Sequence, residues 1–207
     1  MPARLVADHL SMRFGRRRLF DGLTLEVGPG KPVAVVGANG SGKSTLLLIL
    51  AGLVAPTSGA VRLEVDGRVV APEDVPRAVG FAAPTLQLYD TLSARENLAF
   101  LATARGLPEA DARIDRVLER VGLAGRADER VAAFSTGMRH RLRLGTALLH
   151  RPPVLLLDEP GATLDEAGRS LTESVIGDPE AVVVVATNDP SEAALCARRV
   201  MLAGSGV

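Results

Sequence analysis

The stretch VVGANGSGKST, residues 35–45, decides the fold of this 207-residue chain. It has three glycines in six residues, followed by Lys43, one of only two lysines beside 22 arginines. The pattern G-x-x-x-x-G-K-S from Gly37 to Ser44 follows one apolar run and opens another, as a strand–loop–helix unit requires. Its glycines let successive backbone N–H groups surround a phosphate chain, and lysine supplies a compact charge where the wide arginine fork would not fit. The stretch predicts a loop that binds a nucleoside triphosphate.

The same loop predicts individual roles. Lys43 is expected to reach the β- and γ-phosphates and to act in catalysis, and the Ser44 hydroxyl is expected to bind Mg²⁺. The cofactors are therefore ATP and Mg²⁺. The expected ATP-binding residues of this phosphate-binding loop are Gly37, Ala38, Asn39, Gly40, Ser41, Gly42, Lys43, Ser44 and Thr45. The apolar run that follows, residues 46–55, predicts a buried helix.

Three continuous apolar runs predict parallel strands buried on both faces. They cover residues 33–36, 154–157 and 181–186. Polar residues follow the second and third runs, and ligands of open α/β sheets bind at the carboxyl ends of strands. Asp158 is expected to hold Mg²⁺ through a water molecule, as in other P-loop sites. Glu159 is expected to orient or deprotonate the attacking water.

The remaining segments differ in pattern. Residues 23–27 and 61–70 alternate apolar with polar side chains and predict antiparallel strands, with a hairpin turn at Asp66-Gly67. Residues 91–149 have helical periodicity, including a capping box from Ser93 to Glu96, and predict a helical lobe. The fold class is α/β, with a mostly parallel core, an antiparallel subdomain and this lobe, in a single domain over residues 1–207.

Composition excludes several classes of function. The 24 basic and 24 acidic residues balance, so no nucleic-acid partner is expected. The single cysteine excludes an internal disulfide and fits a reducing compartment. No run is long enough to cross a bilayer, so any membrane association would depend on a protein partner. The run Arg16–Arg18 is interpreted as a solvated turn.

Further motifs resemble those of the ATP-binding subunits of ABC transporters. FSTGMRHRL, residues 134–142, resembles the family's signature loop, and GATLD, residues 161–165, resembles its D-loop. Phe14 lies where the family has an aromatic residue that stacks on adenine, although a core phenylalanine is the alternative. The resemblance covers nearly the whole chain, with the motifs in the family's order.

The resemblance implies that two such domains enclose ATP between them. The phosphate-binding loop of each would face the signature loop of the other, at Ser135, Thr136, Gly137 and Met138. Asp165 would reach across the same interface. The implied partners are a second ATP-binding domain, most simply a second copy in a homodimer, and integral membrane subunits. The chain would then lie at the cytoplasmic face of a membrane, held by those partners.

Two positions depart from the family pattern. Pro84 occupies the usual place of a glutamine that contacts Mg²⁺ and water, and a displaced Gln87 is the alternative. Asn188 replaces a histidine that contacts the γ-phosphate; asparagine still donates a hydrogen bond but cannot become cationic. We expect slowed hydrolysis, with an ATP-dependent clamp that hardly turns over as the alternative.

The overall likeness is greatest to the haem-exporter subunit of cytochrome c biogenesis. The stretches STGMRHRLRLGTALLHRPPVLLLDEP and ATNDPSEAALC support it. An exporter of lipid, drug or polysaccharide is the alternative, because the cargo is selected by membrane subunits.

Overall fold

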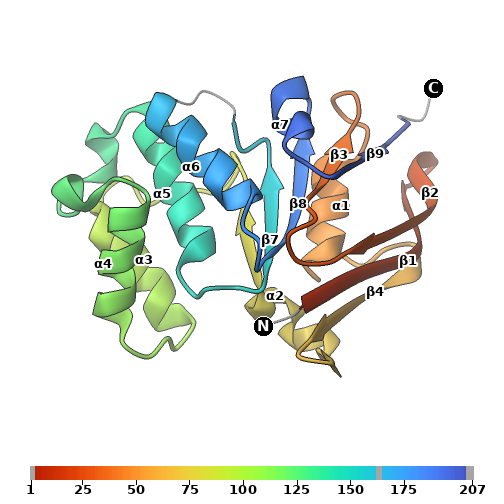
Figure 1. The fold of residues 1–207 in the computed structure, drawn as a ribbon, viewed down its shortest axis with the longest axis horizontal. Coiled ribbons are helices and arrows are strands. Elements are labelled where there is room, and N and C mark those ends of the chain that lie inside the picture. The colour runs from red at the N-terminus through yellow and green to blue at the C-terminus, as the bar shows by residue number, and fades with distance from the viewer. Residues whose placement is uncertain (1–2, 162–164, 204–207) are drawn as a thin grey trace.

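The computed structural model describes residues 3–161 and 165–203. Two sheets and a group of helices lie side by side (Figure 1). Along the chain the elements are β1 (Ala3–Phe14), β2 (Arg17–Val27), β3 (Val33–Val36), α1 (Lys43–Leu50), β4 (Ser58–Val65), β5 (Arg68–Val69), α2 (Val75–Ala78), β6 (Val79–Ala82), α3 (Ala94–Ala104), α4 (Ala110–Arg120), α5 (Thr136–Leu148), β7 (Val154–Asp158), α6 (Glu166–Ile176), β8 (Val182–Thr187), α7 (Pro190–Ala194) and β9 (Arg198–Met201).

The central sheet is parallel, in the order β6-β7-β8-β3-β9. The three predicted buried strands are confirmed as β3, β7 and β8. Side chains along β7 alternate between two hydrophobic clusters: Leu156 packs on the α1 side and Leu155 on the α5 and α6 side. Because the strands are parallel and in register, their carboxyl ends share one edge, where Val36 pairs with Thr187 and Asp158 with Ala186.

The second sheet is antiparallel, in the order β2-β1-β4-β5, and packs over the α1 side of the core. The predicted strands at residues 23–27 and 61–70 are confirmed, with Asp66 and Gly67 both at positive φ in the hairpin turn. The sequence pattern did not predict β1. The strand has a register shift between Asp8 and Ser11, and His9 there has a φ of 47°, so its apolar alternation is interrupted.

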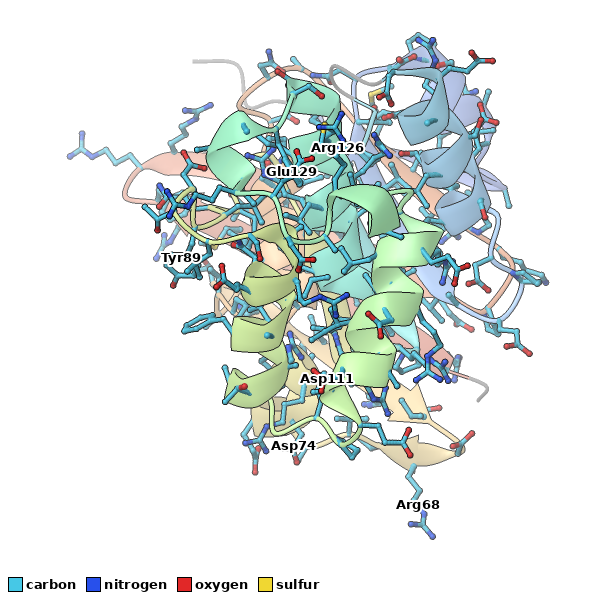
Figure 2. All side chains as sticks on the ribbon, turned by 90° about the vertical axis from the view of Figure 1, so that its left-hand side faces the viewer. Arg68, Asp74, Tyr89, Asp111, Arg126 and Glu129 are labelled. Atoms are coloured by element: carbon cyan, nitrogen blue, oxygen red, sulfur yellow. The ribbon has the colours of Figure 1, made fainter. Side chains whose placement is uncertain are left out.

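The helical lobe contains α3 and α4, which face the viewer in Figure 2. Its predicted capping box is present: Ser93 accepts from the backbone of Glu96, whose side chain accepts from the backbone of Ser93. Asp111 lies near the start of α4, while Arg126 and Glu129 lie side by side beyond its end, with a hydrogen bond of 2.8 Å (Figure 2). The third long helix of the predicted lobe, α5, packs against α3 and α4 and also against strand β6 of the parallel sheet.

One helix is shorter than predicted. The helix expected over residues 46–55 ends at Leu50, because Gly52 has a φ of +71° and packs against Val75. Leu53 consequently lies 55% exposed. Within residues 3–161 and 165–203, the helices are all too short or too polar to span a membrane.

Candidate nucleotide site

A groove of about 560 Å³ runs along the phosphate-binding loop between β3 and α1. Its size is typical of small-molecule sites. The residues that line it come from four parts of the chain: Phe14, Arg17, Leu19, Asn39, Gly40, Gly42, Lys43, Ser44, Thr45 and Glu159. The fold therefore brings together predicted residues of the loop, Glu159 after β7, and Phe14 of the first hairpin.

The backbone of the loop depends on its glycines. Gly40 and Gly42 have φ values of +77° and +103°, which other residues rarely adopt. A Cβ on Gly37 would lie 2.7 Å from the Ser41 Oγ and 2.6 Å from the Leu202 carbonyl oxygen. Side chains at these positions would disrupt the loop, which leads directly into the N-terminus of α1. A helix start with unpaired N–H groups favours a phosphate.

Lys43 is the buried cation of the groove, with only 6% of its surface exposed. Its Nζ donates to the Gly37 carbonyl oxygen and to Asn188 Oδ1, both at 2.9 Å, and lies 3.5 Å from Glu159 Oε1. The ammonium group is thus held by oxygen acceptors at the place where phosphate oxygens would bind.

Asn188 and Glu159 connect neighbouring strand ends to the loop. Asn188 donates from Nδ2 to Asn39 Oδ1 at 2.6 Å, and its backbone N–H donates to Glu159 Oε2 at 3.3 Å. Glu159 has a φ of 45°, and its N–H donates to the Ala186 carbonyl oxygen at 2.8 Å. Left-handed backbone at a non-glycine residue is strained and is concentrated at functional sites. The strain here turns the carboxylate toward Lys43.

Asp158 is 7% exposed, and its Oδ1 has no hydrogen-bond partner within the described part of the chain. Burial raises the pKa of this carboxyl group, and a hydrogen bond with the Ser44 side chain opposes that rise. An isolated buried carboxylate is unfavourable unless a cation or a donor satisfies it. A carboxylate oxygen beside a hydroxyl fits Mg²⁺, which prefers hard oxygen ligands.

The signature residues lie elsewhere. Ser135 caps α5, its Oγ accepting from the N–H of Met138 at 3.2 Å. Ser135, Thr136, Gly137 and Met138 are all absent from the lining of the described groove. Asp165 caps α6 through a 2.8 Å bond from the Gly168 N–H, and a Cβ on Gly137 would lie 3.1 Å from its Oδ2. Residues 162–164 of the predicted D-loop lie outside the described residues.

The family model described as ABC transporter matches residues 20–162. This chain belongs to the ABC transporter family. It is an ABC-type ATPase domain, and the cofactors of that domain are ATP and Mg²⁺. The match includes the phosphate-binding loop, the signature loop and the Asp158–Glu159 pair.

Individual relatives of this ABC domain have varied names. The linearmycin resistance ATP-binding protein LnrL of Bacillus subtilis (strain 168) is 35% identical over 170 residues, which cover 80% of this chain and 54% of LnrL. The aliphatic sulfonates import ATP-binding protein SsuB 2 of Paracoccus denitrificans (strain Pd 1222) is 36% identical over 210 residues, covering 100% of this chain and 80% of that protein. This chain thus spans about half the length of LnrL.

A solved structure described as the ATP binding subunit of an ABC transporter superimposes with a TM-score of 0.82 at 30% identity. The superposition covers 96% of this chain and 85% of the other. The α/β fold of the ABC type is therefore confirmed.

Two positions that were ambiguous in the sequence are placed by the structure of this ABC domain. Phe14 is 57% exposed and lines the groove, so the alternative of a core phenylalanine is wrong. Pro84 is exposed and lies two residues beyond β6, whose last residue, Ala82, pairs with Leu157 of β7. Gln87 is also exposed.

Sequence reasoning missed two residues of the groove, Arg17 and Leu19. The run Arg16–Arg18 was interpreted as a solvated turn. All three side chains are exposed, but Arg17 begins β2 instead of belonging to the turn, and its Nη2 donates to the Gly40 carbonyl oxygen at 2.8 Å. Leu19 packs against Gly42. The sequence feature that could have located Arg17 is the two-residue turn after Phe14, because such a turn pairs Arg17 with Phe14 across the hairpin.

Proposed function

We propose that this chain is the ATP-hydrolysing subunit of an ABC transporter and that two copies close on ATP. The observation that carries the proposal is that, within one chain, the signature loop is separated from the groove. Lys43 and Glu159 line the groove and Asp158 lies against Ser44 of its lining, whereas Ser135 and Gly137 lie outside it. A second copy would supply the missing signature loop.

The residues of one chain have distinct roles in this proposal. Phe14 stacks on adenine, and Lys43 exchanges its present oxygen partners for those of the β- and γ-phosphates. Glu159, held by the Asn188 N–H, orients the attacking water and accepts its proton. Asp158 and Ser44 hold Mg²⁺, which supplies positive charge that offsets the charge of the phosphates.

The opposing copy completes the site. Its Ser135 hydroxyl and Gly137 N–H, at the start of α5, contact the γ-phosphate, since a helix N-terminus favours an anion. Its Asp165 lies at the same interface. Closure and reopening of the pair drive integral membrane subunits docked near the helical lobe, so the chain works at the cytoplasmic face of the membrane.

At a finer level we propose export of the haem and cytochrome c biogenesis type. Support comes from the likeness of the signature helix and of the stretch after β8 to that subunit. A lipid, drug or polysaccharide exporter is the competing proposal, and the name of LnrL, a resistance protein, favours it. Isolating the native complex and identifying its integral subunits decides between them.

A nucleotide-dependent clamp with little hydrolysis is a second candidate, favoured by Pro84 and Asn188. The test uses Glu159→Gln, with Glu119→Gln, an exposed carboxylate on α4, as the matched control. Glu159→Gln should dimerise with MgATP in size-exclusion chromatography with light scattering, and its turnover should fall about a hundredfold or more below the control. Equal turnover in both variants would support the clamp. A monomer with MgATP would refute the proposed dimer.

A further inference from the structure

The hairpin between β1 and β2 places Arg17 beside Phe14. These two residues pair directly across the antiparallel ladder, on either side of a two-residue turn, Gly15-Arg16. Side chains of directly opposed residues lie on the same face of a sheet. Both line the groove, so the guanidinium group and the exposed ring enter it from one face of the hairpin.

Arg17 is fixed in place by the phosphate-binding loop. Its Nη2 lies 2.8 Å from the Gly40 carbonyl oxygen, and a Cβ on Gly40 would be 3.3 Å from the same atom. The guanidinium thus packs against the loop backbone at a point where glycine leaves room for it.

The charge of Arg17 has no acidic partner among the described residues. By contrast Arg18, the next residue along β2, points to the other face and forms a 2.7 Å ion pair with Asp21. An arginine has five N–H donors, and the bond to Gly40 uses one. Donors remain for a planar, charge-assisted contact with an anion in the groove.

The two cations of the groove occupy different parts of it. Lys43 lies beside Glu159 and Asn188, at the ends of β7 and β8, whereas Arg17 lies between Phe14 and Gly40. We propose that Arg17 is a second phosphate contact, which binds the α-phosphate of the nucleotide next to the base held by Phe14. This inference rests on the proposed nucleotide site and adds a residue to it.

The competing explanation is that Arg17 only braces the loop through Gly40. The two explanations differ in their dependence on charge. A contact with phosphate weakens as salt increases, whereas a neutral brace to a carbonyl does not affect the salt dependence of nucleotide binding. A contact with the α-phosphate also affects ATP and ADP equally, because both nucleotides carry it.

The experiment measures the Kd of MgATP and MgADP by calorimetry at several KCl concentrations. The test variants are Arg17→Gln and Arg17→Lys. Arg16→Gln removes the same charge from the neighbouring turn, and Arg68→Gln removes it from β5, where Arg68 projects into solvent at the far edge of the molecule (Figure 2). We expect Arg17→Gln to weaken both nucleotides about tenfold and to flatten the salt dependence. Arg17→Lys should recover part of the loss, and both controls should match the unaltered chain.

An unchanged affinity for Arg17→Gln, or a loss with the original salt dependence, would overturn the inference. An equal loss of affinity in Arg16→Gln would also overturn it, because it would show that any nearby positive charge attracts the nucleotide equally well. MgATP binding by the unaltered chain distinguishes failure of the Arg17 inference from failure of the proposed function. If it binds MgATP while Arg17→Gln behaves normally, only the role of Arg17 fails. If the unaltered chain does not bind MgATP, the proposed function itself fails.

Discussion

Arg141, on α5, allows a quantitative test of how the signature helix is held. Its Nη1 donates to the carbonyl oxygens of Val121 and Gly122, both at 2.9 Å, at the end of α4. Its Nη2 lies 3.7 Å from Asp165 Oδ2, and its side chain is only 12% exposed. One side chain therefore joins the signature helix, the helical lobe and the start of α6.

The perturbation is Arg141→Ala. It leaves two helix-end carbonyls without their donor, and hydrogen bonds to a charged group contribute about 1.5–3 kcal/mol each. The two bonds share one nitrogen and Gly122 lies near the surface, so we expect a total loss of about 2–4 kcal/mol in the free energy of unfolding. The ion pair should add little, because Asp165 is 49% exposed and such pairs contribute about 0.2–1 kcal/mol.

The assay is urea unfolding of Arg141→Ala, Asp165→Asn and the double variant. Asparagine is also a good N-cap, so Asp165→Asn removes the charge while keeping the bond to the Gly168 N–H. The coupling energy of the cycle should stay below about 1 kcal/mol. A loss under about 1 kcal/mol for Arg141→Ala, with an unchanged m-value, would refute the role of the α4 carbonyls. A coupling above about 2 kcal/mol would show that the ion pair is the main interaction instead.

Three other changes test separate contacts. Gly80→Ala should lower the free energy of unfolding by about 1–3 kcal/mol in urea, because its Cβ would be 2.3 Å from the Ala147 carbonyl oxygen; an unchanged midpoint contradicts this packing. Burial lowers the pKa of His150 from 6.5 to about 4, so the folded chain binds fewer protons than the unfolded chain between these values. Stability should fall by about 3 kcal/mol as the pH drops through that window, and His150→Gln should remove this part of the thermal-melt profile. Asn188→Ala should slow steady-state ATP turnover about tenfold, because alanine cannot donate the hydrogen bond that asparagine is expected to give the γ-phosphate, and a normal rate would exclude Asn188 from the site.

The parallel core and the phosphate-binding loop were predictable because both are encoded locally. A buried parallel strand needs a continuous apolar run, and the loop needs glycines at fixed spacing before Lys43. The convergence of Glu159 and Asn188 on that lysine also followed, since the carboxyl ends of parallel strands share an edge.

What the sequence did not predict depends on contacts between distant segments. The end of α1 at Leu50 reflects packing of Gly52 against Val75. The position of Arg17 depends on hairpin register and on Gly40, which lies 23 residues away. The contact of Asp165 with Arg141 likewise joins two elements that no short pattern connects.

The alternation of side chains along β7 has a mechanical consequence. Neighbouring residues such as Leu155 and Leu156 belong to opposite hydrophobic clusters, so the sheet is a stiff partition between α1 and α5. A cavity made on one side should leave packing on the other side largely intact. We therefore expect movement at the phosphate-binding loop to reach the signature helix through the turn at Asp158 and Glu159, which follows β7 and contacts Lys43.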